Sequence, residues 1–204
     1  MIVAVVDSGI ASGHPHVGVV SRGMLLRADG AESPDFSDRI GHGTAVAAAI
    51  LEKAPNIELL AVRVFERELS TTATVLARGI IWAADHGAQL INLSLGTPNT
   101  ARREILLEAV RHASSLGATV ISALEVDGTP YLPGSLPGVI GVRLDWDVPR
   151  ETAIDDGGGV WRASGYPRPV PGVPPTRNLS GISFAVANVT GIVARSLMDA
   201  PGTA

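Results

Sequence analysis

The chain has 204 residues, of which 46% are hydrophobic and 18% are charged, and its formal net charge at pH 7 is −4. This composition argues against a disordered chain, and because no basic patch could neutralise phosphates we expect no nucleic-acid binding. The chain contains no cysteine, which excludes disulfides, a thiolate nucleophile and cysteine-ligated zinc. The length suits one domain with a sizeable core, so we expect residues 1–204 to form a single compact domain.

Short apolar runs alternate with helical patterns along the chain. The runs are apolar on both faces, which is typical of parallel strands that helices cover on both sides. Threonines before the helical patterns, namely Thr71 or Thr72 and then Thr100, are the expected N-caps. The predicted strands are residues 2–7, 58–65, 88–95, 118–124 and 138–143, and the predicted helices are residues 43–54, 71–86, 100–116 and about 183–198.

This alternation predicts the fold class α/β, with a doubly wound, mostly parallel sheet and helices on both faces. In such a fold the functional groups lie at the carboxyl ends of the strands. Residues 144–180 are dominated by Pro, Gly and Asp and suggest only hairpin-like pieces, and residues 199–204 are expected to form a loose tail.

The first residues, MIVAVV, predict a core strand, because they carry no basic n-region and no cleavage site follows them. No apolar run approaches the roughly 20 residues needed to span a bilayer. If Met1 is the natural start, we expect a cytoplasmic protein with no propeptide and no membrane contact.

A carboxylate, Asp7, ends the first predicted strand in VAVVDSGI. The residues after it match neither the G-x-G-x-x-G pattern of dinucleotide-binding folds nor a phosphate-binding P-loop. An Asp after a strand is often only a turn or helix cap. Asp7 by itself therefore leaves a structural and a catalytic interpretation open.

Two further polar residues stand at predicted helix starts. His42 lies between Gly41 and Gly43, where the helix dipole should lower its pKa and keep the imidazole neutral and basic; the alternative is an ordinary loop or core histidine. Ser183 follows Gly181 and Ile182 at the start of a long apolar helix. The N–H groups there could stabilise an oxyanion, and the alternative is a simple N-cap.

The order Asp, His, Ser along the chain is that of the subtilisin type of Ser-His-Asp system. The stretches VAVVDSGI, GHGTAVA and SGISFAVANVTG resemble the Asp, His and Ser motifs of the subtilisin-like serine proteases, the subtilases. A strand-helix-strand stretch ending in Ser94-Leu95-Gly96 and the stretch PGSLPGVIGV (residues 133–142) resemble further segments of the same family. The resemblance covers nearly the whole chain.

This resemblance implies roles for six residues. Ser183 would attack a peptide carbonyl, His42 would take its proton and later pass it to the leaving amine, and Asp7 would orient the imidazole. The tripeptide Ser94-Leu95-Gly96 would pair with an extended peptide by adding it as a strand, although a strand end with a Gly turn would show the same residues. Such catalysis needs no cofactor.

One departure from the family concerns the oxyanion. Subtilases present an asparagine in an Ala-Gly-Asn-x-Gly-like loop, whereas this chain reads ISALEVDG, with Val126 in register and Asp127 as the nearest polar substitute. The remaining donor is the backbone N–H of Ser183. Losing the side-chain donor costs on the order of 10²–10³ in kcat, a magnitude taken from a subtilisin. Burial could keep Asp127 protonated as a substitute donor, while Glu125 beside it could make the loop an acidic rim.

Metal sites are not expected. Asp35 and Asp38 are too few for calcium, which takes 6–8 oxygen ligands, and His14 and His16 lack a third ligand. We expect a peptide or protein substrate as the partner. A protein partner or a homo-oligomer stays open, because trimmed loops would expose apolar surface.

Two functions from different classes follow. The first is a serine endopeptidase that hydrolyses peptide bonds through an acyl-enzyme, slowly or with narrow specificity in peptide processing. The second is a pseudoprotease that keeps the fold as a peptide-binding or regulatory module. A peptide ligase or cyclase is a variant of the first, since the acyl group could pass to an amine instead of water.

Overall fold

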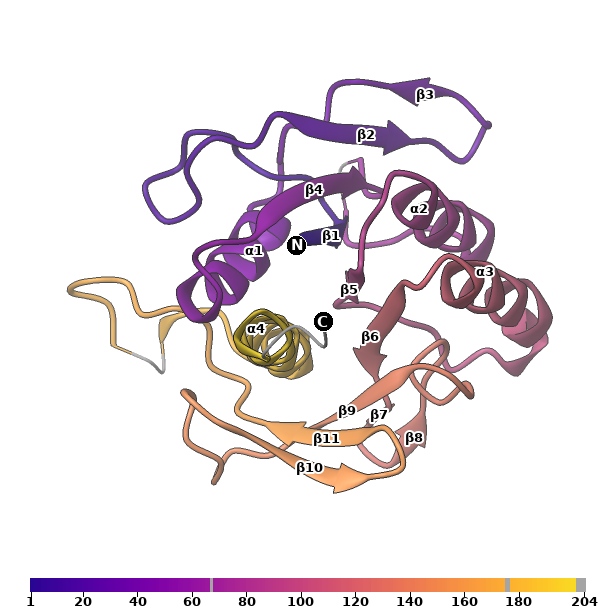
Figure 1. Ribbon diagram of the computed structural model, residues 1–204. Helices are drawn as coiled ribbons and strands as arrows, with labels where there is room; N and C mark the ends of the chain where they lie inside the picture. Colours follow the sequence, from indigo (N-terminus) through magenta and orange to yellow (C-terminus); the bar gives the residue numbers. More distant parts are fainter. Residues whose placement is uncertain (67, 175–176, 201–204) are drawn as a thin grey trace.

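The computed structural model describes residues 1–66, 68–174 and 177–200 (Figure 1). One large sheet forms the centre, and a two-stranded hairpin lies beside it. In chain order the elements are β1 (Ile2–Asp7), β2 (Arg22–Leu26), β3 (Glu32–Ser33), α1 (His42–Lys53), β4 (Glu58–Arg63), α2 (Ala73–Asp85), β5 (Leu90–Leu93), the 3₁₀ helix η1 (Thr100–Arg102), α3 (Arg103–Ser115), β6 (Thr119–Ala123), β7 (Glu125–Val126), β8 (Thr129–Pro130), β9 (Ile140–Leu144), β10 (Ala153–Gly157), β11 (Val160–Ala163) and α4 (Ile182–Asp199).

The sheet has the strand order β10-β11-β9-β6-β5-β1-β4-β2-β3. The strands from β11 to β2 pair in parallel, and only the edge strands β3 and β10 pair antiparallel. After β1 the chain builds the sheet first on the side of β4 and then on the side of β5. The carboxyl end of β1 is therefore a topological switch point, where doubly wound folds place their ligands.

Helices cover both faces of this sheet, as Figure 1 shows, with α1 and α4 on one face and α2 and α3 on the other. Strand β1 serves both layers because successive side chains of a strand point to opposite faces. Its Ala4 and Val6 belong to the α2–α3 core, whereas Val3 and Val5 belong to the α1–α4 core. The predicted fold class is thus confirmed.

Most predicted elements lie within two or three residues of their observed bounds, with a few corrections. Thr72 caps α2 as predicted, but Thr100 does not cap α3: it begins η1, whose cap is the Asn99 side chain. Strands β4 and β5 each end two residues earlier than predicted, at Arg63 and Leu93. The strands β2 and β3 and the hairpin β7–β8 were not predicted, because they are short and lack a clear apolar pattern.

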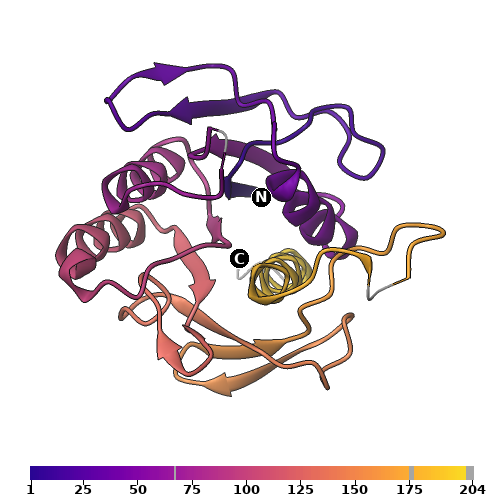
Figure 2. The ribbon, with the colours of Figure 1, turned by 180° about the vertical axis from the view of Figure 1, so that it is seen from behind.

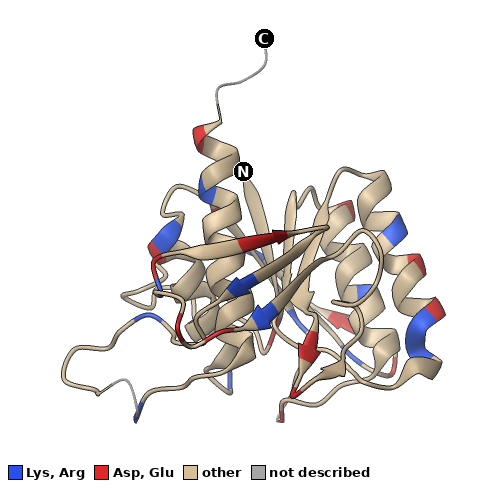
Figure 3. Cartoon of the chain, turned by 90° about the horizontal axis from the view of Figure 1, so that it is seen from below, with Lys and Arg blue, Asp and Glu red and all other residues tan. Residues whose placement is uncertain are grey.

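Helix α4 sets the geometry of the carboxyl end. It starts at the end of the sheet where β1 stops and runs back, so that the N-terminus and the last turn of α4 lie at the opposite end (Figure 3). Asp199 belongs to this helix and not to a loose tail, and residues 201–204 lie outside the described residues. The view from behind shows the segment before α4 reaching outward beside α1 (Figure 2). None of the helices in the described residues is both long and apolar enough to cross a membrane.

Candidate active site

Asp7 and His42 meet at the carboxyl end of β1. Asp7 is fully buried, and its Oδ1 accepts a hydrogen bond of 2.7 Å from the Ser8 N–H. His42 is the first residue of α1, and its Nδ1 lies 2.8 Å from Oδ1 and 3.0 Å from Oδ2 of Asp7. The imidazole keeps 14% of its side-chain surface exposed, so one ring edge faces the solvent side. The pair has the geometry by which a carboxylate orients a histidine.

The pKa of His42 departs from the expectation drawn from the helix dipole. Burial lowers the pKa, but the hydrogen bond to Asp7 and the negative charge of Asp7 outweigh burial, with a smaller contribution from Asp38. The pKa is therefore raised above 6.5, and the predicted lowering is wrong. The physical reason is that a carboxylate in direct contact favours the imidazolium more than a helix terminus disfavours it.

Asp38 holds the start of α1 in place, a role that the sequence analysis missed. Its Oδ1 accepts from the Ile40 and Gly41 N–H groups and from Ser8 Oγ at 2.8–2.9 Å, and its Oδ2 accepts from the N–H and hydroxyl of Thr44. These hydrogen bonds hold the pKa of Asp38 below its usual value although burial opposes them. An acidic residue shortly before a predicted helix was the available signal.

Close packing brings α1 onto the loop after β1. A Cβ atom on Gly43 would lie 2.2 Å from the Gly9 carbonyl oxygen and 3.1 Å from Asp7 Cβ. No real Cβ atom tolerates the first distance, so this position requires glycine. The glycine after His42 thus determines how closely the helix approaches the strand that carries Asp7.

Ser183 lies at the start of α4, close to His42. The N-cap of α4 is Gly181, with φ of 137°, so the alternative interpretation of Ser183 as an N-cap is wrong. Phe184, the next residue, places its ring centroid 5.9 Å from that of His42. Among the described residues, the Ser183 N–H has no hydrogen-bond acceptor. It belongs to the first turn of the helix, where N–H groups lack intrahelical partners.

The Ser183 hydroxyl is directed to a backbone carbonyl. Ser183 Oγ donates to the Ser94 carbonyl oxygen at 2.9 Å, and Ser94 Oγ donates to the Ser183 carbonyl oxygen at 2.9 Å. Asn92 Nδ2 donates to Ser94 Oγ, and Thr190 Oγ1 lies 3.0 Å from Asn92 Oδ1. Within the described residues no hydrogen bond joins Ser183 to His42. The structure therefore pairs Asp7 with His42 and ties Ser183 to Ser94 through buried polar groups.

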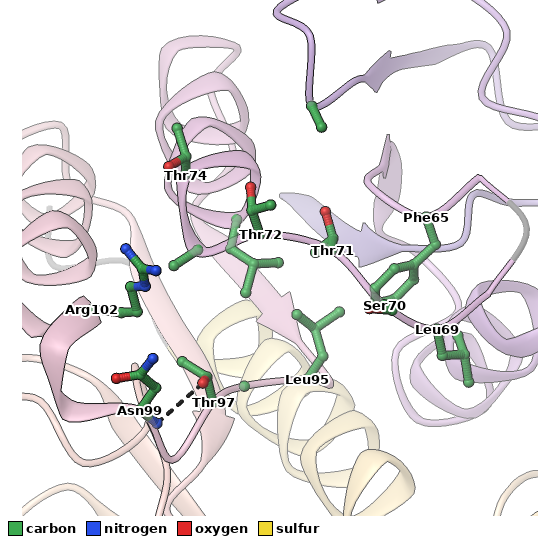
Figure 4. Close-up of a pocket in the computed structure, with 14 residues that line it drawn as sticks. Phe65, Leu69, Ser70, Thr71, Thr72, Thr74, Leu95, Thr97, Asn99 and Arg102 are labelled. Atoms are coloured by element: carbon green, nitrogen blue, oxygen red, sulfur yellow. Dashed lines mark hydrogen bonds between the residues drawn. The ribbon is translucent and has the colours of Figure 1, made fainter.

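The tripeptide Ser94-Leu95-Gly96 leaves the sheet after β5 and borders a cavity of about 680 Å³ (Figure 4). Leu95, Gly96 and Thr97 line one side of this cavity, and Ser70 and Thr71 before α2 line another. Thr97 forms an antiparallel bridge with Leu132, with both N–H···O distances at 2.9 Å. A Cβ on Gly96 would lie 2.6 Å from the Leu132 carbonyl oxygen, so this close approach needs glycine.

The two residues that stand nearest the position of the oxyanion asparagine, Val126 and Asp127, lie on the β7–β8 hairpin. Val126 is half-buried and pairs with Thr129, whereas Asp127 is exposed at the turn with φ of 50°. The condition for a protonated donor at Asp127 was burial, and this condition is not met. Glu125 lies 3.4 Å from Arg143 Nε and so belongs to a surface ion pair.

No three histidine, aspartate or glutamate side chains of the described residues come together as a metal site. Asp35 pairs with Arg39, and Asp38 is occupied as described above. His14 and His16 lie on a surface turn with ring centroids 5.5 Å apart.

Comparisons with known proteins agree with this geometry. The profile of the subtilase family matches residues 1–143. Thermitase of Thermoactinomyces vulgaris is 31% identical over 210 residues, which cover 93% of this chain and 72% of thermitase. The thermophilic serine proteinase of Bacillus sp. (strain AK1) is 35% identical over 150 residues, which cover 69% of this chain but only 37% of that protein.

The prenylagaramide maturation protease PagA is a similar solved structure. It superimposes with a TM-score of 0.70 and is 29% identical, and the match covers 97% of this chain and 75% of PagA. The sequence identity, the shared fold and the pairing of a buried aspartate with a histidine at the switch point all indicate the same relationship. The chain belongs to the subtilase family.

Proposed function

We propose that this chain is a serine endopeptidase of the subtilisin type, with Ser183 as nucleophile, His42 as general base and Asp7 as the residue that orients His42. The observation that carries the proposal is the Asp7–His42 pair, with Nδ1 2.8 Å from the carboxylate, next to the start of α4. An Nδ1–H donated to Asp7 leaves the lone pair on Nε2, which is the atom that must accept a proton from the serine.

The proposed reaction starts with a rotation of the Ser183 hydroxyl from the Ser94 carbonyl to His42 Nε2. Oγ attacks the peptide carbonyl and its proton moves to Nε2, which gives a tetrahedral intermediate. The negative oxygen accepts from the unpaired Ser183 N–H at the positive end of α4. His42 then gives the proton to the leaving amine as the C–N bond breaks, which leaves the acyl group on Ser183 Oγ. Water attacks this ester, His42 takes the proton of the water and passes it to Ser183 Oγ, and the peptide acid leaves.

The cavity beside Ser94-Leu95-Gly96 suits an extended peptide substrate. Addition of the peptide as a strand satisfies its backbone, and the lining side chains select residues. Such an addition would compete with Ser183 Oγ for the Ser94 carbonyl, which would free the hydroxyl for His42. The likeness to PagA, a prenylagaramide maturation protease, supports peptide processing as the role.

The proposed enzyme is slow, because the loop that carries an asparagine in subtilases reads ISALEVDG in this chain. Val126 stands at the expected position and Asp127 is exposed. The backbone N–H of Ser183 then acts without the side-chain donor, whose loss costs on the order of 10²–10³ in kcat. An acyl-enzyme that waits for water also gives amines time to attack, and an amine that takes the acyl group yields a ligated or cyclised peptide by the same chemistry.

A pseudoprotease that binds peptides is the second candidate function. The observation that favours it is the Ser183 hydroxyl, which donates to Ser94 and not to His42. Both candidates use the same cleft, and only the first requires a reactive serine.

Intact mass after incubation with a fluorophosphonate tests the proposal, since this reagent labels an activated serine. We expect an adduct on the native chain that His42→Ala and Ser183→Ala both abolish. A folded native chain without an adduct would favour the pseudoprotease. Val126→Asn tests the oxyanion, because a restored side-chain amide should raise the labelling rate. Incubation with a peptide and an added amine then separates hydrolysis from ligation by product mass.

A further inference from the structure

Another cavity, of about 280 Å³, lies beside the start of α1 and shares no lining residue with the cavity at Leu95 and Gly96. Three segments far apart in the chain enclose it: the loop after β1, the start of α1, and the proline-rich segment (residues 166–174) that precedes α4. Figure 1 shows this segment beside α1, away from α2 and α3. The lining of the cavity includes His14, His16, Ala45, Ala48, Pro167 and Arg168.

The walls of this cavity are mostly apolar, with a cationic group among them. Arg168 is half-buried, and among the described residues its guanidinium makes one hydrogen bond, from Nη1 to the His16 carbonyl oxygen at 3.1 Å. An arginine carries five N–H donors in a fixed fork, so most of them remain for a ligand. Beside it, burial and then the charge of Arg168 lower the pKa of His16.

Asp38 is the acidic residue that lines the same cavity. Its two oxygens already accept five hydrogen bonds from Ser8, Ile40, Gly41 and Thr44. These donors at the start of α1 stabilise the negative charge of Asp38. Glu52, which also acts on His16, is paired with Arg150. Arg168 is thus a cation of this cavity for which the described residues provide no acidic partner.

The position of the cavity suits the part of a substrate that follows the scissile bond. In the proposed reaction the leaving amine takes its proton from His42, so the chain that follows the scissile bond must approach α1. Gly41, Thr44 and Ala45 of that helix start line the cavity, and so does Asn178, five residues before Ser183. His42 and Ser183 themselves do not line it, so the bound group would be some residues away from the scissile bond.

We propose that this cavity binds a carboxylate in the leaving segment of the substrate and that Arg168 recognises it. The inference rests on the proposed endopeptidase function and adds a specificity to it. Arginine suits the role because its planar fork binds carboxylates through two parallel hydrogen bonds. The carboxylate could be an acidic side chain or the carboxyl terminus of the peptide.

Three peptides with the same acyl half and the same cleavage site test the inference. One has a glutamate in the leaving segment and an amidated end, the second has neutral side chains and a free carboxyl terminus, and the third is neutral and amidated. For the native chain we expect kcat/KM to be about 10-fold to 100-fold higher for one of the first two than for the third, the effect of a charge-assisted hydrogen bond. The preferred peptide identifies the source of the carboxylate.

Variants of the loop assign the preference to Arg168. Arg168→Gln should remove it, and Arg168→Lys should keep part of it because the charge stays. Arg177→Gln is the matched control, since Arg177 is an exposed arginine between the same segment and α4 and does not line the cavity. A structural role of Arg168 alone would lower the rate for all three peptides equally. Equal kcat/KM for the three peptides with the native chain would overturn the inference.

Binding to Ser183→Ala separates this inference from the proposed function. The affinities of the same peptides, measured by calorimetry, should show the same order without any turnover. If the native chain cleaves all three peptides without preference and binding is also equal, the carboxylate site is refuted while the endopeptidase stands. If no peptide is cleaved but the carboxylate peptides bind more tightly, the endopeptidase function fails and the site stands.

Discussion

Replacing Asp38 by asparagine should destabilise the start of α1. The carboxylate accepts hydrogen bonds from Ser8, Ile40 and Gly41 on one oxygen and from Thr44 on the other. In Asp38→Asn the amide NH₂ replaces the second oxygen and faces the Thr44 N–H, so that two donors meet. A hydrogen bond to a charged acceptor contributes about 1.5–3 kcal/mol. The substitution removes both hydrogen bonds from Thr44 to the carboxylate, and rotation of the Thr44 hydroxyl recovers part of the loss. The free energy of unfolding should therefore fall by about 3 kcal/mol.

Thermal unfolding measures this loss. For a chain of this length about 3 kcal/mol corresponds to a decrease in Tm of about 6–12 °C. Asp147→Asn is the control, because Asp147 is exposed and no hydrogen bond to its carboxylate is found among the described residues. Its Tm should stay close to that of the native chain.

The pH dependence gives a second test of the same reasoning. The pKa of Asp38 in the folded chain is lower than 3.8, so its stabilisation is fully present above the pKa of the unfolded chain and is lost as the pH falls through the folded value. The difference between native and Asp38→Asn chains should therefore be constant near neutral pH and shrink below pH 3.8. Equal Tm values at pH 7, or a difference that persists unchanged in acid, would refute the role of the carboxylate.

Three further outcomes are expected. Gly43→Ala should fail to fold or lose fluorophosphonate labelling, because its Cβ would lie 2.2 Å from a carbonyl oxygen of the loop after β1; circular dichroism and labelling check this. The labelling rate should rise with pH through a midpoint above 6.5, since His42 must be neutral and Asp7 raises its pKa, and Asp7→Asn should move the midpoint down. Thr190→Val should lower the free energy of unfolding by about 1–3 kcal/mol, because Asn92 Oδ1 loses a buried partner; urea denaturation measures it.

Each of these three predictions can be contradicted by its own measurement. A folded, fully labelled Gly43→Ala chain would show that α1 does not need its close approach to β1. A labelling midpoint that Asp7→Asn leaves unchanged would show that Asp7 does not raise the pKa of His42. For Thr190→Val the control is Ser196→Ala, which removes a hydroxyl that donates to the Ile192 carbonyl on a more exposed part of α4. An equal cost for both variants would show that the buried link to Asn92 is not special.

Much of the architecture could be predicted from local patterns. Runs such as residues 2–7 and 118–124 are apolar on both faces, and only parallel strands between two helix layers bury both faces. The helix bounds followed from caps such as Thr72 and from glycine stops. Short edge strands such as β3 and the β7–β8 hairpin carry no such pattern, because partner strands and not their own side chains hold them.

For the candidate site, the sequence predicts which residues belong to it but not their environment. The motifs around Asp7, His42 and Ser183 can be read in the sequence because each side chain is tied to a local turn or helix start. The raised pKa of His42 could not be predicted from the sequence, since it depends on a direct contact between residues 35 positions apart. The exposure of Asp127 likewise depends on a hairpin that turns it away from the core.

The sequence by itself determined the α/β class, the family motifs and the reading ISALEVDG in the loop after the fourth predicted strand, because these are properties of residue identity and of short-range periodicity. Only the tertiary structure decided that Asp38 clamps α1, that Ser183 Oγ is held by the Ser94 carbonyl, and that Arg168 faces a cavity next to the start of the His42 helix. The physical reason is that hydrogen-bond partners and burial arise from segments that meet only after the chain folds, such as Ser94 and Ser183, which are 89 residues apart.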